Sequence, residues 1–457
     1  MEKKRALTIF LGFGPAGSKM TTSTTRLPIW MQRNVIPPLL LVLCPPTVFI
    51  LWYTAVHLDG SFQAFWHLAV ANGLFSTIGS IWGPIFFGTP TAWAILAGFA
   101  SFQLFLMRFV PGKSFTGPIT PMGNIPVYKA NGIASFLITV TTFLLATYKL
   151  HLFSPTIIYD NLGPLLGALN LFSLLFCLFL YFKGIYAPSS SDCGTTGNPF
   201  FDYYWGTELY PRIFGFDVKM FTNCRFGMMG WSLILLSYMA KQQQVYGLSD
   251  SMMVAVALQL IYIGKFFFWE TGYLRSLDIM HDRAGFMICW GCMVWLPCLY
   301  TSPTLYLVNH PNHLGTFWAT AIFVAGSLSI LINFLADRQR QQVRAKNGAC
   351  LIWKRPPSLI HASYTTVTGE TKQTLLLSSG WWGISRHFHY VPELLGTFFW
   401  TLPALFSNFL PYCYLIFLTI LLVDRALRHD KRCSDKYGEH WEKYCEQVPY
   451  KIIPYLF

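Results

Sequence analysis

Long apolar stretches alternate with short polar ones along most of the chain. Between Arg33 and Arg108 the only formal charge is Asp59. A run of that length must hold more than one membrane crossing, because about 20 apolar residues span a bilayer. The pattern predicts helical spans near 35–56, 63–86, 92–109, 131–151, 162–186, 228–240, 252–269, 284–308 and 316–336. Three segments are mainly polar or charged: 187–227, 337–393 and 428–457.

The last apolar stretch, 394–427, is too long for one crossing and is interrupted by Pro403, Asn408 and Pro411. We expect a tight hairpin of two short helices here. A hairpin would return the chain to the side it left, so that the basic residues before and after it share that side. The pattern as a whole predicts an all-α, polytopic transmembrane protein with ten or eleven crossings.

The composition agrees with this class. Of 457 residues, 53% are hydrophobic and 12% are charged, against about 25% charged in a soluble domain. The mean hydropathy is +0.42. The net charge of +13 would suggest nucleic acid in a soluble protein, but in a membrane protein it is explained by the excess of Lys and Arg in cytosolic loops. We therefore expect no nucleic-acid partner, and the 11 cysteines form no disulfide pattern.

Two short motifs resemble ligand-binding motifs, but their sequence context does not support a dinucleotide site or a zinc site. Residues 12–17 fit G-x-G-x-x-G, but no helical pattern follows, and the first acidic residue downstream is Asp59. Cys289 and Cys292 form a lone C-x-x-C inside a predicted span. A structural zinc site needs four ligands, and the sequence has no second pair. We predict no metal site.

Seven ionisable residues gather between the spans near 252–269 and 284–308. They are Lys265, Glu270, Arg275, Asp278, His281, Asp282 and Arg283. Ionisable groups at a membrane edge are costly and usually face an interior cavity. Their three- and four-residue spacings allow a structural ion-pair network along a helix. The alternative is a site that delivers protons or anchors a substrate, because buried acids often titrate at unusual pH.

Three other segments combine residue types that bind ligands. Residues 198–212 are dense in aromatics, which alone indicates an interfacial belt. Arg340 and Arg344 share a helix face, so they suit a phosphate group or simply flank a span. Residues 375–390 hold paired tryptophans, two glycines, an arginine, two histidines and a tyrosine. Such a mix suits an aromatic ring stacked beside polar donors.

Together these segments resemble the ergosterol-reductase family of sterol C=C reductases. The similarity covers roughly residue 30 to the end, and its strongest parts are 198–212, 375–390 and 436–454. Within the family, the chain looks most like the members that reduce the C7=C8 double bond of Δ5,7-sterols. The supporting stretches are 269–274, 278–282, 295–301 and 350–353.

The resemblance implies about ten transmembrane helices, a sterol pocket reached from the lipid, and an NADPH site open to the cytosol. We expect a polar N-terminal segment at 1–33 and an N-terminal transmembrane half at 34–227. The C-terminal half, 228–457, would form the sterol and NADPH sites. The implied partners are membrane lipid and a sterol that comes from the bilayer. Association with other sterol-biosynthesis enzymes is compatible with the resemblance. The membrane would be the endoplasmic reticulum in a eukaryote and the inner membrane in a bacterium.

By position, the resemblance also implies the residues that bind NADPH. They are Arg340, Arg344, Leu377, Trp382, His389, Tyr390, His429, Cys433, Ser434, Asp435, Lys436, Tyr437 and Tyr444. The family often has Lys in place of Arg340, and usually Asn in place of His389 and Asp in place of His429. Asp430 is the nearest candidate to replace that carboxylate.

The implied reaction needs an acid, because an unactivated sterol double bond cannot accept hydride directly. A general acid first protonates the double bond, and hydride then adds to the opposite carbon. Residues that could form the acid network are Glu270, Asp278, His281, Asp282 and Tyr300.

Other functions fit parts of the same pattern. A Δ14- or Δ24-sterol reductase is one, since a small difference in an apolar pocket is worth only about 1–3 kcal/mol. A membrane methyltransferase is another, although Phe388 stands where that family usually has Pro. A non-catalytic sterol-binding membrane protein is the third. The departures at His389 and His429 favour it, whereas the intact tryptophan and tail motifs oppose it.

Overall fold

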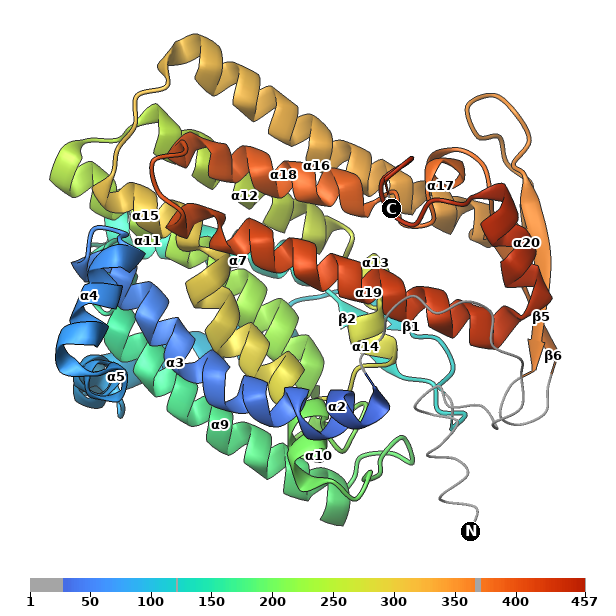
Figure 1. The fold of residues 1–457 in the computed structure, drawn as a ribbon, viewed down its shortest axis with the longest axis horizontal. Coiled ribbons are helices and arrows are strands. Elements are labelled where there is room, and N and C mark those ends of the chain that lie inside the picture. The colour runs from blue at the N-terminus through green and yellow to red at the C-terminus, as the bar shows by residue number, and fades with distance from the viewer. Residues whose placement is uncertain (1–27, 121, 366–370, 457) are drawn as a thin grey trace. The chain divides into compact units, whose positions relative to one another are not determined.

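The computed structural model describes residues 28–456, except residue 121 and residues 366–370 (Figure 1). The described chain divides into two compact units. The larger unit comprises 28–316 and 403–414, and the smaller unit comprises 317–402 and 415–456. Helices dominate both units, and the only strands among the described residues form three two-stranded hairpins. The predicted class, a helical polytopic protein, is confirmed.

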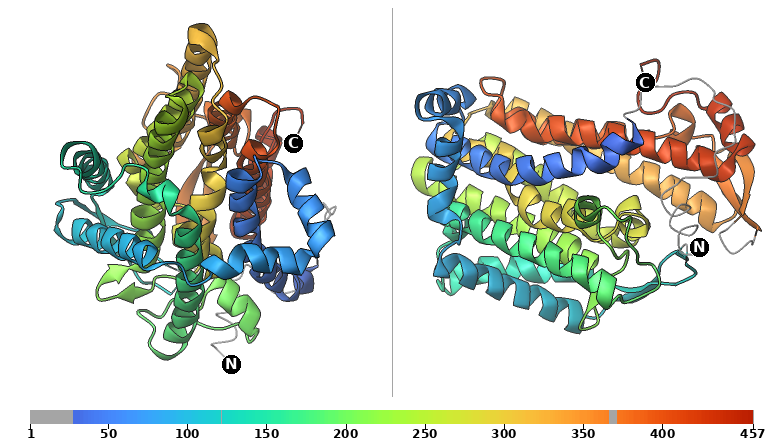
Figure 2. Two further views of the ribbon diagram at one scale, coloured as in Figure 1. Left: turned by 90° about the vertical axis from the view of Figure 1, so that its left-hand side faces the viewer. Right: turned by 60° about the horizontal axis from the view of Figure 1, so that its bottom comes forward.

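The larger unit is built mainly from α-helices (Figure 2). They are α2 (Ile29–Asn34), α3 (Ile36–His57), α4 (Phe62–Asn72), α5 (Leu74–Trp82), α6 (Pro90–Phe109), α7 (Gly132–Leu144), α8 (Ile157–Asp160), α9 (Leu162–Tyr186), α10 (Pro199–Trp205), α11 (Met229–Tyr246), α12 (Asp250–Phe268), α13 (Glu270–Tyr273), α14 (Leu277–Met280) and α15 (Ser302–Asn309). Several begin at a capping hydroxyl. The Ser61, Thr89 and Ser249 side chains accept backbone N–H bonds at the starts of α4, α6 and α12.

Wider and tighter helical turns complete this unit. The π-helical segments are η2 (Leu145–Lys149), η3 (Met220–Met228) and η4 (Phe286–Tyr300), and the 3₁₀ turns are η1 (Gly83–Ile85) and η6 (Leu410–Tyr412). Two hairpins pair β1 (Lys113–Thr116) with β2 (Val127–Ala130) and β3 (Arg212–Ile213) with β4 (Phe216–Asp217). Both pairs are antiparallel, with Lys113 opposite Ala130 and Arg212 opposite Asp217.

The core of the larger unit forms around η4. This segment packs against α9, η3 and α3, and most of its side chains are buried. Trp290 stacks on Phe286 with ring centroids 4.5 Å apart, and its indole N–H donates to the side-chain oxygen of Asn170 in α9 at 2.8 Å. Inside a membrane such a polar contact satisfies groups that lipid cannot.

Eight helical segments among the described residues are long and apolar enough to cross a membrane. They are Ile36–His57, Pro90–Phe109, Gly132–Lys149, Leu162–Tyr186, Asp250–Phe268, Phe286–Asn309, Gly315–Ala345 and Leu410–Tyr437. The predicted span 63–86 is instead two helices, α4 and α5, which meet at 112° and would count as a ninth span if taken together. Gly73, with a φ of +82°, forms the corner, a conformation that glycine adopts without strain. The number of crossings stays a prediction.

The predicted polar segment 187–227 ends too late, because η3 already begins at Met220 and continues into α11. The apolar pattern does not predict this helical segment, because Asn223 and Arg225 interrupt it. Arg225 is nevertheless fully buried, with an ion-pair partner. A paired charge can therefore be buried in this helix, although apolar periodicity alone does not predict the helix.

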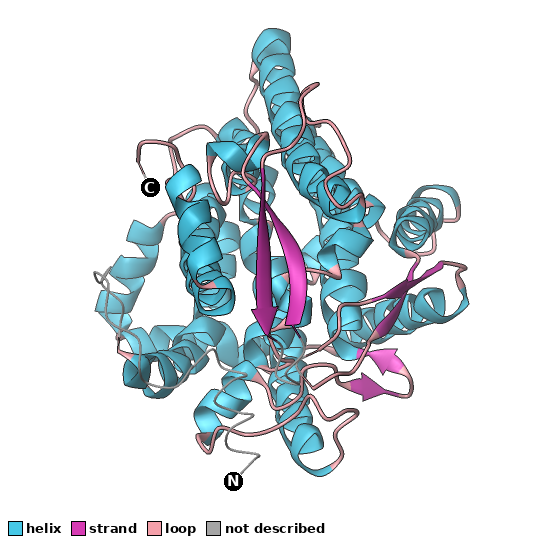
Figure 3. Cartoon of the chain, turned by 90° about the vertical axis from the view of Figure 1, so that its right-hand side faces the viewer, coloured by secondary structure: helices cyan, strands magenta, loops and turns pink. Residues whose placement is uncertain are grey.

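The smaller unit contains the rest of the described chain, including the longest strand pair, which Figure 3 draws in magenta. Its elements are β5 (Leu359–Thr365), β6 (Thr371–Leu377), α17 (Trp381–Ile384), α18 (Tyr390–Thr401), α20 (Glu439–Gln447) and most of α16 (Gly315–Ala345) and α19 (Cys413–Tyr437). The short turn η5 (Leu402–Ala404) contributes only Leu402 to this unit. The strands β5 and β6 are antiparallel, with Leu359 opposite Leu377 and Thr365 opposite Thr371. Helix α20 packs on β5, and a buried cluster that includes Ala362, Trp441 and Val448 joins them.

The predicted break in the last apolar stretch is confirmed. Helix α18 ends at Thr401 and α19 begins at Cys413, with Pro403 and Pro411 in the connection. The expected division into halves at residue 227 concerns function rather than compactness, and it stays a prediction. Residues 12–17, which fit the glycine-rich motif, lie outside the described residues, as does most of the expected segment 1–33.

Candidate functional site

The end of α16 and the tryptophan motif lie together in the smaller unit. The indole N–H of Trp382 donates to the carbonyl of Ala336 at 2.8 Å, and the ring is buried. The guanidinium carbon of Arg340, one turn after Ala336, lies 3.9 Å from the centre of the Trp382 ring. The negative face of an indole attracts a cation in this position. Trp382 therefore helps to fix the head group of Arg340.

The turn that presents this tryptophan requires a glycine. Gly380 has a φ of +64°, and a Cβ atom there would lie 2.3 Å from the side-chain oxygen of Gln339. That oxygen accepts a bond from the backbone N–H of Trp381 at 2.9 Å. The close approach ties α17 to α16, so the sequence Gly380-Trp381-Trp382 places the second ring against the helix.

Positive charge gathers around His429 on α19. Four arginines act electrostatically on its ring: Arg340, Arg344, Arg425 and Arg432. Lys436 adds a cation within range of Arg344 and Arg432. Grouped cations raise the local concentration of anions and favour an anionic ligand. The predicted phosphate residues Arg340 and Arg344 are thus part of a larger basic cluster.

Sequence reasoning missed Arg425 and Arg432, which resemble the ordinary flanking charges of a span. Their spacing carried the missing signal. Residues 425, 429, 432 and 436 recur at three- and four-residue intervals, so they share one face of a helix. The apolar pattern predicts an end near residue 427, whereas α19 runs to Tyr437 without a break, so these charges lie on one continuous helix.

Residues 385–387 hold the C-terminal tail. The Ser385 hydroxyl donates to the carbonyl of Ile452 at 2.7 Å, the Arg386 N–H to that of Tyr450 at 2.9 Å, and the His387 N–H to that of Lys451 at 2.8 Å. The Arg386 guanidinium also donates to the carbonyl of Val448 at 3.0 Å and pairs with Asp430 at 3.2 Å. These contacts, the tail clamp, join the tryptophan motif to α19 and the tail. Asp430, expected as a replacement carboxylate, is paired within the clamp.

Aromatic and imidazole rings line the same region. The ring centroids of His389 and Tyr390 are 4.2 Å apart, and those of His387 and Tyr390 are 5.2 Å apart and nearly parallel. Burial, followed by neighbouring positive groups, lowers the pKa of His387 well below its usual value, so this ring is neutral at pH 7. The Tyr444 hydroxyl donates to the carbonyl of Trp382 at 3.3 Å, and burial raises its pKa, so it keeps its proton.

The other residues expected to bind the cofactor lie on the same elements. Leu377 packs with Val343 and Trp382 in one buried cluster, and Cys433 packs with Trp441 and Tyr444 in another. Tyr437 is partly buried beside the second cluster, whereas Ser434, Asp435 and Lys436 are exposed. The Lys436 ammonium lies 3.7 Å from the ring centre of Tyr364 in β5. All the expected cofactor residues therefore belong to the smaller unit.

This donor set suits a phosphorylated dinucleotide. Guanidinium groups match the geometry of phosphate oxygens and bind them in pairs. Trp382, Tyr390 and Tyr444 offer flat rings and fixed polar atoms next to the basic cluster. Within the described residues no group of three or more His, Cys, Asp or Glu side chains is placed to hold a metal ion. The residues present therefore fit the expected NADPH.

The acid candidates lie in the larger unit, and Glu270 differs from the rest. Its buried carboxylate pairs with Arg225 at 2.5 Å and accepts the backbone N–H of Gly132 at 2.8 Å. Arg225 also donates to the side chain of Asn131 at 2.8 Å. Breaking a buried pair of this kind leaves an uncompensated charge. The pair ties the start of α13 to η3 and α7.

Asp278, His281 and Asp282 lie on one short segment. Asp278 is in α14, and the other two follow in the turn before η4. Asp282 is buried, whereas Asp278 and His281 are half-buried. Tyr300 is at the opposite end of η4, where its ring packs against Trp231 and Tyr414. The structure therefore groups three of the five acid candidates, and places Glu270 and Tyr300 in other contacts.

The predicted aromatic segment 198–212 contacts the residues that directly follow residues 278–282, which we call the acid segment. Asn198 caps α10 by accepting the backbone N–H groups of Phe200 and Phe201 at 3.1 and 3.2 Å. The carbonyl of Glu208 accepts the N–H of Ala284 at 3.1 Å, directly after the acid segment. The Arg283 guanidinium donates to the carbonyl of Thr207 at 3.4 Å.

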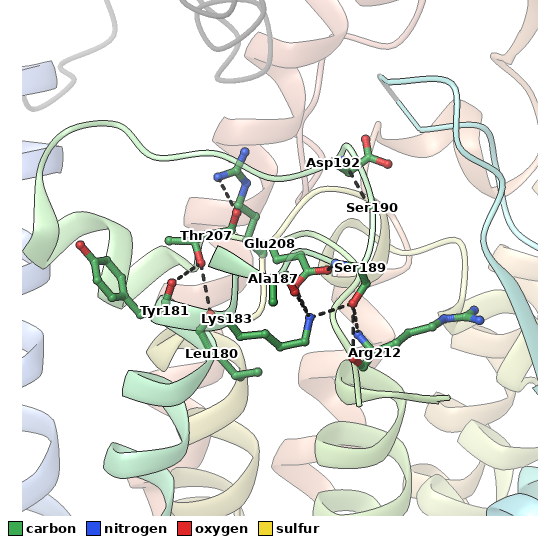
Figure 4. A network of polar contacts seen from close by, with 11 residues as sticks. Leu180, Tyr181, Lys183, Ala187, Ser189, Ser190, Asp192, Thr207, Glu208 and Arg212 are labelled. Atoms are coloured by element: carbon green, nitrogen blue, oxygen red, sulfur yellow. Dashed lines mark hydrogen bonds and ion pairs between the residues drawn. The ribbon is translucent and has the colours of Figure 1, made fainter. Parts of the chain in front are cut away.

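Glu208 is itself fixed by a polar network at the end of α9 (Figure 4). Lys183 pairs with the Glu208 carboxylate at 2.8 Å and donates to the Ser189 hydroxyl at 2.8 Å. The backbone N–H of Ser189 donates to the second carboxylate oxygen at 2.5 Å, and the Arg212 N–H donates to the Ser189 hydroxyl at 2.9 Å. The sequence indicated an aromatic belt, but the polar members of the segment make most of these contacts.

A known protein family matches most of the chain. The profile of the "Ergosterol biosynthesis ERG4/ERG24 family" matches residues 47–457. The chain belongs to this family. The match includes both candidate clusters and every residue expected to bind the cofactor or supply the proton.

Relatives within the ERG4/ERG24 family extend over nearly the whole chain. The chain is 55% identical to the 7-dehydrocholesterol reductase of Arabidopsis thaliana over 92% of its length and 96% of the relative. It is 41% identical to the 7-dehydrocholesterol reductase of Xenopus laevis over 81% of each chain. It is 35% identical to the Delta(14)-sterol reductase of Methylotuvimicrobium alcaliphilum, over 92% of this chain and 94% of the relative. With its apolar helices, the chain is thus a multi-pass membrane oxidoreductase of sterol biosynthesis.

Proposed function

We propose that this protein is an NADPH-dependent sterol reductase that saturates the C7=C8 double bond of a Δ5,7-sterol. We choose the C7=C8 double bond because the chain is 55% identical to a 7-dehydrocholesterol reductase along 92% of its length. The substrate would be an apolar polycyclic alcohol drawn from the bilayer, in keeping with the many apolar helices. Its location would be the endoplasmic reticulum membrane in a eukaryote and the inner membrane in a bacterium.

The smaller unit would bind the cofactor. Arg340, Arg344 and Arg432 would contact the phosphates, because guanidinium forks bind phosphate oxygens in pairs. The buried rings of Trp382, Tyr390 and Tyr444 would line the rest of the site, and exposed residues 434–436 would lie at its edge. When bound, NADPH supplies the hydride and leaves as NADP⁺.

The segment that carries Asp278, His281 and Asp282 would supply the proton. The proton adds to one carbon of the double bond and leaves a carbocation on the other, which then receives the hydride. One proton and one hydride together saturate the bond, so charge and electrons balance. The protein must hold the acid and the sterol in line and exclude water, because a carbocation reacts with water.

Glu270 and Tyr300 would act through structure rather than by donating the proton. Glu270 is used as the carboxylate partner of Arg225, and Tyr300 packs with Trp231 and Tyr414. In this account the two residues shape the larger unit around the acid segment.

A Δ14-sterol reductase is the second candidate, favoured by the 35% identity with a bacterial enzyme of that name. The test offers purified protein and NADPH three sterols in parallel, with double bonds at C7, C14 or C24, and identifies products by mass spectrometry. We expect the Δ5,7-sterol to be reduced at least about tenfold faster than the others, which corresponds to about 1.4 kcal/mol. Preferred reduction of the Δ14-sterol would establish the second candidate. Sterol binding without any NADPH oxidation would mean that the protein is not a reductase.

A further inference from the structure

Lys219 is a buried lysine that supplies neither the proton nor the hydride in the proposed reaction. It precedes η3 in the larger unit and is 1% exposed. Its ammonium donates to three backbone carbonyls, those of Asp278 at 3.0 Å, Ile279 at 2.7 Å and Asp282 at 2.8 Å. One side chain thus binds the final turn of α14 and the turn after it.

These carbonyls belong to the segment that carries the acid candidates. The last carbonyls of a helix lack partners within the helix, and α14 has only four residues. An ammonium has three N–H donors, so Lys219 can satisfy all three carbonyls at once. Because the carbonyls of Asp278 and Asp282 are fixed, the directions of their side chains and of His281 between them are restricted.

The far end of the segment is held separately. Arg283 donates to the carbonyl of Thr207, and the N–H of Ala284 donates to the carbonyl of Glu208. The segment between Asp278 and Asp282 is therefore also held just beyond its end, by contacts that do not involve Lys219. Lys219 provides the one that bears directly on the acid residues.

The charge on Lys219 depends on its surroundings. The titratable groups that act on it are Asp217 in β4, Asp278 and Asp282 in the acid segment, and Cys289 in η4. The ring of Tyr210 lies 4.9 Å from the ammonium. Burial lowers the pKa of Lys219 to about 8, and the carboxylates oppose this effect. The lysine is an ammonium at neutral pH and loses its third donor as the pH rises through about 8.

We propose that Lys219 is a positioning residue that orients the proton-donating segment by holding its backbone carbonyls. The proposal rests on the proposed function, because it assigns the proton to Asp278, His281 or Asp282. Lys219 touches neither sterol nor cofactor in this account. A residue of this type should affect the rate of turnover more than the binding of either substrate.

The test compares Lys219→Met and Lys219→Arg with the wild type in purified enzyme. Met has a similar length but no donor, and the planar guanidinium of Arg cannot reproduce the three bonds of an ammonium. We expect kcat to fall at least about tenfold in Lys219→Met, a change of about 1.4 kcal/mol in the barrier. The Kd for NADPH and the KM for sterol should change less than threefold. Lys219→Arg should recover part of the lost kcat.

The pH profile distinguishes positioning from a general effect on folding. Wild-type kcat should decline as the pH rises through about 8, because the ammonium is lost. In Lys219→Arg this decline should disappear, since a guanidinium stays charged. Lys241→Met is the matched control, because Lys241 pairs with Asp160 at 2.7 Å and lies in the same unit. It should keep both the wild-type kcat and the wild-type pH profile.

Each outcome decides the proposal. Wild-type kcat in folded Lys219→Met would overturn it, and so would parallel loss of NADPH binding, which indicates general disruption. If Lys219→Met does not fold, hydrogen exchange of residues 277–284 in the wild type replaces it. Protection, corrected for intrinsic exchange rates, should fall between pH 7 and pH 9.5, and unchanged protection would overturn the proposal. Failure of the proposed function looks different, because the wild type itself would then not reduce any sterol.

Discussion

At the scale of single residues, the acid candidates differ in burial and in the part of the chain that holds them. Glu270 and Arg225 are buried and bind each other, so they serve structure. Asp278 and His281 are half-buried on a short segment held by its backbone. We place the proposed proton source on this segment because it brings three acid candidates together, whereas the Glu270 carboxylate is bound to Arg225.

Replacing Asp278 or Asp282 with Ala should abolish turnover. Each carboxyl group is a candidate for the donor or for its partner in the proton network, and general acids typically contribute about 10²–10⁴-fold to a rate. NADPH binding should be unchanged, because both residues belong to the larger unit and the expected cofactor residues to the smaller one. The measurement is sterol turnover together with a fluorescence titration of NADPH. Full activity in both variants would disprove the assignment.

Arg432→Gln should weaken NADPH binding without a comparable loss of kcat at saturating cofactor. Removal of one charge-assisted contact costs about 1.5–3 kcal/mol, which is about tenfold or more in Kd. The control is Arg428→Gln, because Arg428 is already paired with Asp424 at 2.8 Å on the exposed part of α19. Equal Kd values for the two variants would remove Arg432 from the cofactor site.

At the scale of elements, contacts distant in sequence hold the candidate sites together. Hydropathy predicted most of the long helices and the break before α19, because both follow from apolar length and proline position. It did not predict η3, whose polar Arg225 is satisfied by Glu270, 45 residues away. It also gave no hint that Lys219 binds carbonyls about 60 residues later, since a carbonyl carries no sequence signal. The motifs predicted the residues of the candidate sites, whereas the contacts that hold these residues in place appear only in the three-dimensional structure.

The tail clamp makes a prediction at this scale. Asp430→Asn removes the charge that pairs with buried Arg386, so the free energy of unfolding should fall by about 1–3 kcal/mol. Thermal unfolding in detergent, with and without NADPH, measures the loss. Asp424→Asn is the matched control on the same helix, because its pair with Arg428 is exposed and should be worth less than about 0.5 kcal/mol. An equal shift in the two variants would show that the clamp adds no stability.

At the scale of the whole molecule, membership of the ERG4/ERG24 family and the apolar helices together describe a membrane enzyme. The fold class followed from composition and pattern, and the family followed from three ordered motifs. The choice between sterol double bonds did not follow from the fold, because relatives at 55% and 35% identity carry different names. A few contacts in an apolar pocket are enough to change that choice.

Isotope tracing with 7-dehydrocholesterol shows where each of the two added hydrogen atoms comes from. Purified protein is given NADPH carrying deuterium at C4 of the nicotinamide in ordinary water, and then unlabelled NADPH in D₂O. We expect the first reaction to place one deuterium on C7 or C8, and the second to place one deuterium on the other carbon. Both deuteriums from the same source, or no saturated product, would contradict a proton from the protein followed by hydride from NADPH.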